Sequence, residues 1–224
     1  MRKGHHRGTV RGKRMLELGN QCIRDARVAE RTGKEYFTRL GAEHISIDLN
    51  GRDGALKIDL SAPMDRHGWR EYFDIVTNCG TAEHVEPHEA QYQCFKNIHD
   101  CLKAGGIAIH LLPDIHELRD RGCWKRHCNN YYSREFVEML AQHNGYRIYS
   151  LEISDGMTFC CVQKNGSAEF MQDRTEFLKY ITREKGGIIY PGSNDQGVSR
   201  IHMLYERLLY YIPRLISRVT RQIP

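Results

Sequence analysis

Short apolar runs bounded by Gly, Asn, Asp or Pro alternate with longer mixed segments along the chain. This alternation is typical of strands separated by helices in a parallel sheet. It predicts seven strands, at residues 15–18, 44–48, 56–60, 73–78, 106–112, 149–154 and 157–163. The segments between them predict helices over residues 34–42, 88–103 and 133–145, the last with Ser133 as N-cap and Gly145 as its stop.

The last two predicted strands are separated only by Asp155 and Gly156, a dipeptide that suits a tight hairpin. One strand must then run antiparallel to an otherwise parallel sheet. Beyond residue 164 the pattern changes, and it predicts a helix over residues 169–183 and another from Ser199. The predicted fold class is therefore α/β: a seven-stranded, mostly parallel sheet with helices on both faces, an antiparallel last strand and a helical C-terminal extension. We expect a basic arm at residues 1–14, one α/β domain at 15–165 and the extension at 166–224.

The composition supports a folded domain without a membrane span. The chain has 224 residues, of which 40% are hydrophobic and 27% charged, which argues against wholesale disorder, collagen-like structure and coiled coil. No stretch approaches the roughly 20 apolar residues that a bilayer span needs, and the start does not resemble a signal peptide. The eight cysteines show none of the paired short spacings of a zinc site, so we expect no metal and reduced thiols in a cytoplasmic protein.

Charge is distributed unevenly along the chain. Residues 1–14 carry six basic and no acidic side chains, residues 166–224 carry nine against six, and residues 15–165 carry 18 against 22. Solvated termini are one interpretation, and contact with nucleic acid or anionic lipid is another. The predicted helix at 199–223 is basic, amphipathic and kinked by Pro213, so it suits either a membrane surface or docking on its own core or a partner subunit. The oligomeric state stays open.

Polar residues and glycines gather where the predicted strands end. A strand that stops at glycine lets the backbone approach a ligand at the carboxyl edge of a sheet, and a carboxylate after the second strand can accept both hydroxyls of a ribose. The residues concerned are Glu17, Gly19 and Asn20 after the first strand, Asp48 and Leu49 after the second, Asp59 and Leu60 at the third, and Asn78, Cys79 and Gly80 at the fourth.

Five segments, MLELGN, ISIDLNG, KIDLSAP, FDIVTNCGTAEHV and CLKAGGIAIHLLP, follow one another in this order. Over residues 13–165 the chain resembles the class I S-adenosylmethionine-dependent methyltransferases, which are Rossmann-like. The resemblance implies S-adenosyl-L-methionine as cofactor, bound by the ten strand-end residues above. Glu17 and Gly19 would lie by the methionine part, Asp48 would hold the ribose, Asp59 and Leu60 would flank the adenine, and Asn78, Cys79 and Gly80 would lie under the sulfonium.

The first glycine loop departs from the family pattern. That pattern, ExGxGxG, has glycine where this chain has Gln21 and Ile23, and the distance from Gly19 to Asp48 is about ten residues longer than usual. An insertion at residues 21–33 would reshape the cofactor lid. The departures leave open a catalytically silent methyltransferase-like binding module. A nicotinamide-dependent oxidoreductase is disfavoured because GxGxxG is absent.

Two histidines are candidate catalytic bases. A neutral imidazole is the natural proton acceptor for a hydroxyl near pH 7, and we rank His84 before His116, with His110 expected to be a core residue. Residues 113–132, rich in aromatic and basic side chains, are expected to select the acceptor. We expect a small-molecule, glycan or lipid-linked acceptor, methylated on oxygen or nitrogen. RNA or protein is the alternative, although the (N/D)PP(Y/F) tetrapeptide of nucleic-acid amino methyltransferases is absent.

Overall fold

The computed structural model describes residues 10–23, 25, 27–116 and 128–183, which all belong to one compact unit within residues 1–189. The predicted helix from Ser199, most of the basic arm and residues 117–127 of the predicted acceptor-selecting segment lie outside the described residues. Within the described part, no helix has the length and apolar character needed to cross a membrane.

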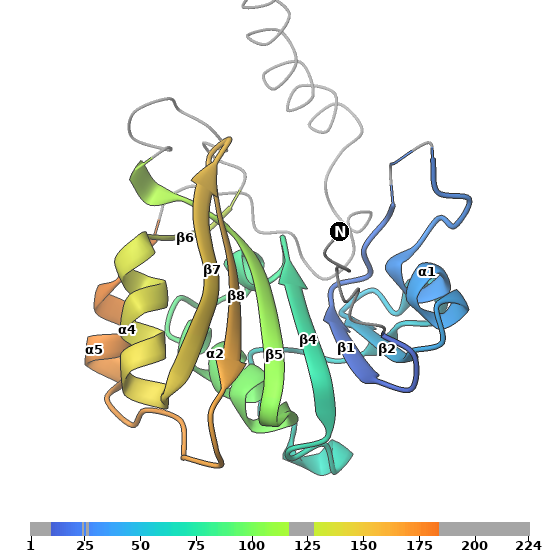
Figure 1. Ribbon diagram of the computed structural model, residues 1–224. Helices are drawn as coiled ribbons and strands as arrows, with labels where there is room; N and C mark the ends of the chain where they lie inside the picture. The colour runs from blue at the N-terminus through green and yellow to red at the C-terminus, as the bar shows by residue number, and fades with distance from the viewer. Residues whose placement is uncertain (1–9, 24, 26, 117–127, 184–224) are drawn as a thin grey trace, which may run out of the picture. The chain divides into compact units, whose positions relative to one another are not determined.

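A seven-stranded sheet forms the centre of the unit, in the order β3-β2-β1-β4-β5-β8-β7 (Figure 1). Strands β1 to β5 pair in parallel, whereas β8 runs antiparallel to both of its neighbours, β5 and β7. The predicted sheet with its reversed last strand is therefore confirmed. The strands are β1 (Arg14–Leu18), β2 (Glu43–Asp48), β3 (Leu56–Lys57), β4 (Phe73–Cys79), β5 (Leu102–Pro113), β7 (Tyr146–Ser154) and β8 (Met157–Lys164).

The strand predicted over residues 56–60 is shorter than expected. Only the two residues of β3 pair with β2, so Asp59 lies in the turn that follows. In that turn Ser61 N–H donates to Asp59 Oδ1 at 2.8 Å, and Ile58 and Leu60 are buried on either side of the exposed Asp59. The alternation of buried and exposed residues is thus that of a strand, but the ladder hydrogen bonds have ended.

Three helices connect the strands at the predicted places: α1 (Gly33–Arg39), α2 (Ala90–Cys101) and α4 (Arg134–Asn144). Ser133 caps α4 by accepting from Phe136 N–H, and Gly145 ends it with φ +65°, as predicted. Thr32 and Glu35 form a capping box on α1. Because the crossovers β1–β2 and β4–β5 step in opposite directions along the sheet, right-handed connections place α1 and α2 on opposite faces.

The helix predicted over residues 169–183 was wrong in extent. The chain forms only α5 (Arg174–Lys179), capped by Asp173, and then β9 (Ile181–Arg183), which pairs antiparallel with β6 (Asn130–Tyr132). Phe170 and Met171 are buried in the main core before α5 begins, and this anchoring prevents an earlier helix start. Residues 166–183 therefore pack onto the same core as the sheet.

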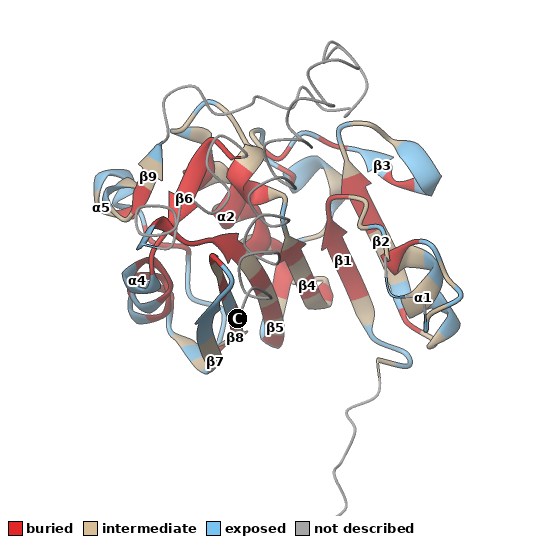
Figure 2. Cartoon of the chain, turned by 90° about the horizontal axis from the view of Figure 1, so that it is seen from above, coloured by how far each residue is buried: buried red, intermediate tan, exposed pale blue. Residues whose placement is uncertain are grey.

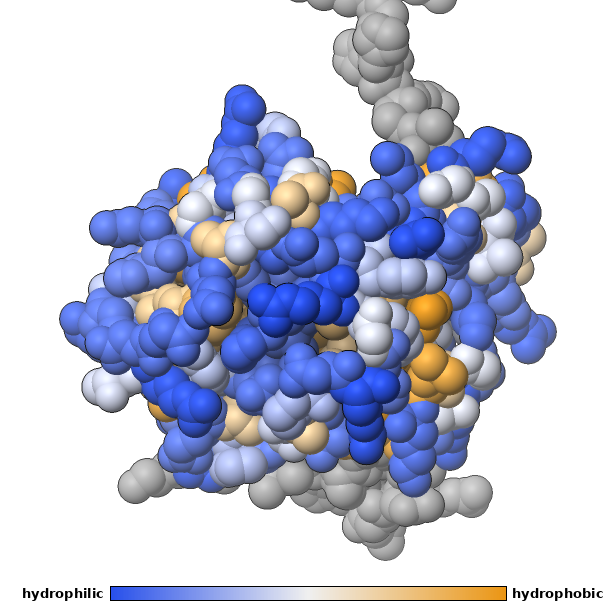
Figure 3. Space-filling model, turned by 90° about the horizontal axis from the view of Figure 1, so that it is seen from below, coloured by the Kyte–Doolittle hydropathy of each residue, from blue (hydrophilic) through white to orange (hydrophobic). Residues whose placement is uncertain are grey.

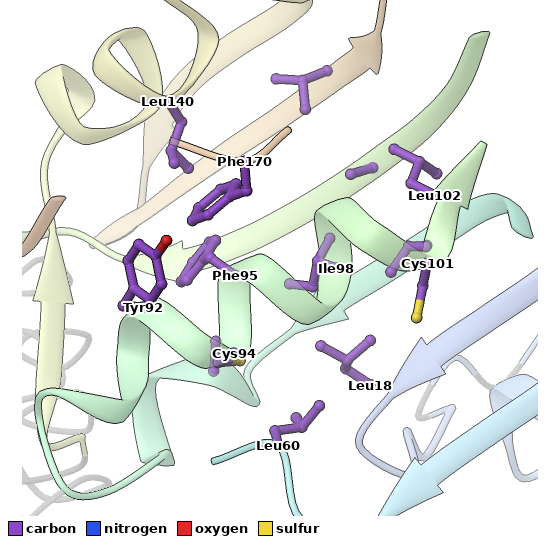
Figure 4. Packing of buried hydrophobic residues seen from close by; sticks show 14 of the residues in the cluster. Leu18, Leu60, Tyr92, Cys94, Phe95, Ile98, Cys101, Leu102, Leu140 and Phe170 are labelled. Atoms are coloured by element: carbon purple, nitrogen blue, oxygen red, sulfur yellow. The ribbon is translucent and has the colours of Figure 1, made fainter. Parts of the chain in front are cut away.

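Aromatic side chains between α2 and α4 join these elements to one another (Figure 4). Phe95 of α2 packs edge-on against Tyr132 and Phe136 at centroid distances of 5.8 and 5.0 Å. Tyr92 OH donates to the carbonyl of Met171 at 2.7 Å. Burial of these rings fixes β6 beside the end of β5, where Tyr132 bridges to Asp114, because Tyr132 belongs both to the core and to β6.

The two edges of the sheet differ in kind. Figure 2 looks down on the edge at which the parallel strands end, where the buried residues of β1, β4 and β5 reach the surrounding turns. Figure 3 views the opposite edge, whose visible surface is mainly hydrophilic with one hydrophobic area. In open α/β sheets ligands bind at the carboxyl ends of the strands, so the candidate site is sought there.

Candidate active site at the carboxyl edge of the sheet

The turn after β1 depends on the absence of a side chain at Gly19. This residue has φ +77°, and a Cβ there would lie 2.3 Å from Thr81 Oγ1. Gly19 N–H donates to the carbonyl of Ile47, and Thr81 Oγ1 donates to the carbonyl of Leu18 at 2.9 Å. The ends of β1, β2 and β4 are therefore joined in one tight turn.

Glu17 lies beneath this turn and is 2% exposed. Its Oε1 accepts from Gln21 N–H at 2.9 Å, and its Oε2 lies 3.3 Å from His44 Nε2. A Cβ on Gly33, the first residue of α1, would lie 2.1 Å from the same Oε2. Both carboxylate oxygens thus contact the protein itself, and Glu17 holds the turn that would face a ligand.

The predicted insertion at residues 21–33 is closed at its base. Gly33 N–H donates to the carbonyl of Gln21 at 2.9 Å, and Ile23 N–H donates to that of Arg31. Gln21 also donates from its side chain to Thr81 Oγ1 at 3.3 Å. A side chain therefore stabilises this turn where the family pattern has only glycine.

Asp48 is oriented by two backbone donors at the end of β2. Its Oδ2 accepts from Asn20 N–H at 3.1 Å and its Oδ1 from Asn50 N–H at 2.9 Å. Asn20 donates through Nδ2 to Asp53 at 2.8 Å, while its Oδ1 is buried without a hydrogen bond among the described residues. Each carboxylate oxygen has a further lone pair, so Asp48 can still accept two hydroxyl donors. We call Glu17, Gly19, Asn20 and Asp48 the β1–β2 edge.

Three further residues predicted to bind the cofactor, Leu49, Asp59 and Leu60, differ in how far their side chains are exposed. Leu49, beside Asp48, is an exposed hydrophobic side chain, as expected for a surface that contacts a ligand. Asp59 is exposed, whereas the side chain of Leu60 is buried in the core and its carbonyl accepts from Asn97 Nδ2. Leu60 can therefore offer a ligand only its backbone.

The end of β4 is held from below by a buried amide. Asn78 is fully buried; its Nδ2 donates to His110 Nδ1 at 3.2 Å and its Oδ1 accepts from Ala82 N–H at 3.0 Å. His110 lies in the core, as predicted, and burial lowers its pKa to about 4, so the ring is neutral near pH 7. Asn78 thereby fixes the short 3₁₀ helix η3 (Ala82–His84), and both polar atoms of its side chain contact the protein itself.

Cys79 and Gly80 complete the turn above Asn78. Gly80 has φ +73°, and its N–H donates to the carbonyl of Leu111. Burial and the carboxylates of Glu17 and Glu83 raise the pKa of Cys79 to about 11, so this thiol is protonated near pH 7. The turn can contact a ligand through its backbone and through an uncharged thiol.

Across from this turn, η3 and residues 128–132 form a second polar structure, which we call the η3–β6 platform. Asn130 Nδ2 donates to the carbonyls of Glu83 and Val85 at 3.2 and 3.1 Å, and Asn129 N–H donates to Glu83 as well. Gln91 Nε2 donates to the carbonyls of Ala82 and Val85, and Tyr132 OH donates to Gln91 Oε1 at 2.6 Å. These contacts fix η3 from three separate elements.

Glu83, on the platform, is a buried carboxyl group. It is 2% exposed, and burial raises its pKa to about 8. Its Oε2 has no hydrogen-bond partner among the described residues. Such a group is costly in a protein interior unless a proton or a cation compensates it.

The two predicted bases lie in different environments. His84 belongs to η3 and is partly buried, with Nε2 4.0 Å from Glu83 Oε1. His116 has a 55% exposed side chain whose Nε2 lies 3.9 Å from Glu135 Oε2, beyond the end of β5. Asp114, next to it, is buried and accepts from Thr158 Oγ1 at 2.8 Å. Only His84 therefore adjoins the turn at Asn78.

Comparison with known proteins agrees with the sheet topology. No family model and no curated protein matches the chain. Among solved structures, an O-methyltransferase family protein from Burkholderia thailandensis superposes with a TM-score of 0.50 at 8% identity, over 70% of this chain and 52% of that one. The chain has the class I methyltransferase fold. It spans about half the length of that relative.

Two further solved structures of this fold are similar at slightly lower scores. A 1,6-didemethyltoxoflavin-N1-methyltransferase from Burkholderia thailandensis, with S-adenosylhomocysteine bound, has a TM-score of 0.49 at 13% identity over 70% of this chain and 72% of its own. A putative S-adenosylmethionine-dependent methyltransferase from Listeria monocytogenes has a TM-score of 0.48 at 14% identity, over 71% and 94%.

The sequence analysis did not identify two residues that build the η3–β6 platform. Gln91 and Asn130 carry no local motif, because Asn130 bonds Glu83 and Gln91 bonds Tyr132, each more than 40 residues away along the chain. Thr81 was missed as well, although its oxygen links the ends of β1 and β4. The one available signal was the density of polar residues in NNYY, within a segment predicted to select the acceptor.

Proposed function

We propose that the protein is an S-adenosylmethionine-dependent methyltransferase whose cofactor binds at the β1–β2 edge. The observation that carries the proposal is Asp48, a carboxylate held by two backbone N–H groups at the end of β2, beside a glycine turn with φ +77°. The class I methyltransferase fold supports the same edge as the binding position.

The residues present fit the cofactor at three points. Asp48 keeps two acceptor positions for ribose hydroxyls, Asn20 Oδ1 is a buried acceptor without a donor, and Asp59 is an exposed carboxylate that can accept from an adenine amino group. Glu17 acts through Gln21 N–H by holding the turn, so its role by the methionine part is indirect. Cys79 and Gly80 would line the sulfonium side, above the buried Asn78.

S-adenosylmethionine supplies a methyl group activated by positive sulfur. The protein's part is alignment of the acceptor and exclusion of water. We assign the acceptor side to the η3–β6 platform, where His84 Nε2 can receive or hold the proton of an attacking group. Because His116 is exposed and pairs with Glu135, we do not assign it a catalytic role.

The acceptor we propose is a small molecule, glycan or lipid-linked compound. The platform supports this choice because Asn130 bonds the carbonyl of Val85 and Tyr132 bonds Gln91, so these polar groups are already used within the protein. An RNA or protein acceptor would rely on the basic residues of segments outside the described part.

Mass spectrometry of the purified full-length chain tests the proposal first, because S-adenosyl ligands often remain bound. Titration calorimetry with S-adenosylhomocysteine then measures affinity for wild type and for Asp48→Asn. Binding by the wild type that weakens strongly in the variant supports the assignment. A folded wild type that binds neither S-adenosylmethionine nor S-adenosylhomocysteine would reduce the protein to a silent member of the fold.

A further inference from the structure

Three potential metal ligands meet on the η3–β6 platform. A carboxylate oxygen of Glu83, a ring nitrogen of His84 and the sulfur of Cys128 all lie within 4.8 Å of one another. Glu83 and His84 come from η3, whereas Cys128 immediately precedes β6, so the tertiary fold creates the cluster. The spacing of cysteines along the sequence gave no indication of it.

An unpartnered atom points to a missing ligand at this place. Glu83 Oε2 is buried and accepts no hydrogen bond from any described residue, although backbone donors surround its main chain. Buried polar atoms are rarely left in this way unless an ion or water completes them.

We propose that Glu83, His84 and Cys128 bind one divalent metal ion of the zinc class. Imidazole nitrogen, thiolate sulfur and carboxylate oxygen are the three donor types that zinc takes in proteins, and the mixed set disfavours magnesium and calcium, which prefer oxygen alone. On binding, the Cys128 thiol gives its proton to solvent and forms a sulfur–metal bond. The thiolate and the carboxylate then balance the two charges of the ion.

Hydrogen bonds to the main chain of Glu83 hold the metal-ligand cluster in place. The main chain of Glu83 is bonded by Asn129 N–H and Asn130 Nδ2, and Asn130 Oδ1 accepts from His88 Nδ1 at 2.7 Å. In a tetrahedral zinc site the ligand atoms lie about 3.4–3.8 Å apart. The three donor atoms now lie within 4.8 Å of one another, so side-chain rotations that move them by roughly 1 Å would bring them to these distances around an ion.

Three protein ligands leave a fourth position open, as in catalytic zinc sites. His84 is the only partly exposed member of the three, with a 20% exposed side chain, so the open position belongs on its side. This last step rests on the proposed function: a hydroxyl oxygen of the acceptor would take that position and lose its proton more readily there. His84 would then act as a ligand to the ion and not as the base, because the ion would lower the pKa of the bound group so that solvent could accept its proton.

Cobalt(II) is the probe for the test, because it occupies zinc sites and absorbs light. The full-length chain, freed of metal by a chelator, should take up one equivalent of Co²⁺ with a near-ultraviolet thiolate-to-cobalt band, and Zn²⁺ should displace it. Cys128→Ser should abolish that band and weaken binding at least tenfold. Cys161→Ser and Cys22→Ser, which change thiols on β8 and in the 21–33 loop, should leave it intact.

Failure has a clear form. Uptake of less than one equivalent by a folded wild type, judged by circular dichroism, would overturn the metal site, as would a thiolate band that persists in Cys128→Ser. If Cys128→Ser does not fold, Glu83→Gln serves instead, because it keeps the thiolate and should still weaken binding. Calorimetry with S-adenosylhomocysteine on the same samples separates the two proposals, since Asp48 and the cluster lie on different elements.

Discussion

The β1–β2 edge and the η3–β6 platform face the same end of the sheet but are built in opposite ways. At the edge, Asp48 and Glu17 each accept from a backbone N–H two or four residues away, and Asp48 accepts a second backbone N–H from Asn20 at the end of the neighbouring strand. On the platform, side-chain amides and a hydroxyl make the bonds, those of Asn130 and Tyr132 join residues more than 40 positions apart, and Glu83 Oε2 receives none among the described residues. Carboxylates held by backbone N–H groups present a fixed surface to a ligand, whereas the platform carries a buried carboxylate oxygen, Glu83 Oε2, that still needs a partner.

The largest effect that would sharpen this contrast is on the edge. Asp48→Asn keeps the size of the side chain but replaces a charged acceptor, and each hydrogen bond to a charged group contributes about 1.5–3 kcal/mol. We expect affinity for S-adenosylhomocysteine to fall about 100-fold in calorimetry. Asp65→Asn, on an exposed 3₁₀ turn, is the matched control and should change nothing. Equal affinity in Asp48→Asn and wild type would remove the ribose assignment.

The next effect concerns the packing beneath the edge. Gly33→Ala would improve helix propensity, but its Cβ would lie 2.1 Å from Glu17 Oε2. We expect a loss of about 2 kcal/mol in the free energy of unfolding, measured in urea, as is typical for an overpacked site. In a Glu17→Ala background the same substitution should be neutral or stabilising. Simple additivity of the two changes would show that the carboxylate does not occupy this space.

A smaller effect is expected on the platform. Asn130→Ala removes three hydrogen bonds and leaves the buried carbonyls of Glu83 and Val85 with fewer donors. The predicted cost is about 1.5 kcal/mol of unfolding free energy in the metal-free chain. The neighbouring Asn129→Ala deletes an amide nitrogen that has no described acceptor, so it should cost less than half as much. A larger cost for Asn129→Ala would reverse our view of which residue holds η3.

The same contrast explains what the sequence could and could not predict. The seven strands, the Asp155–Gly156 hairpin and the caps of α4 follow from periodicity and local turn chemistry, and the structure confirms them. The strand ends brought Gly19 and Asp48 together as expected, because parallel strands end at one edge. The resemblance could not show that Glu17 and Asn78 bind the protein itself, since that depends on Gln21, His44 and His110 in three dimensions.

The partners of the platform were beyond reach for a related reason. Pairing of β6 with β9 depends on Phe170 and Phe177 entering a core formed mainly by α2 and α4. Helical periodicity over residues 169–183 gave no indication of this anchoring, so the last three residues, Ile181–Arg183, were predicted as helix although they form β9. Without β6 in place, Cys128 and Asn130 have no defined position relative to η3.

The smallest effect tests the residue that supports the platform from the core. The pKa of His110 is lowered by burial to about 4 from 6.5, so between these values the unfolded chain binds a proton that the folded chain does not. The contribution of the neutral His110 ring to stability is therefore fully present above pH 6.5 and is lost as the pH falls towards 4. His110→Leu should lower the free energy of unfolding at pH 7, because Asn78 Nδ2 loses its acceptor. Between pH 6 and pH 5, however, the free energy of unfolding of the variant should fall by about 1 kcal/mol less than that of the wild type. Parallel pH dependences in the two proteins would mean that His110 is protonated in the fold and that Asn78 is held in some other way.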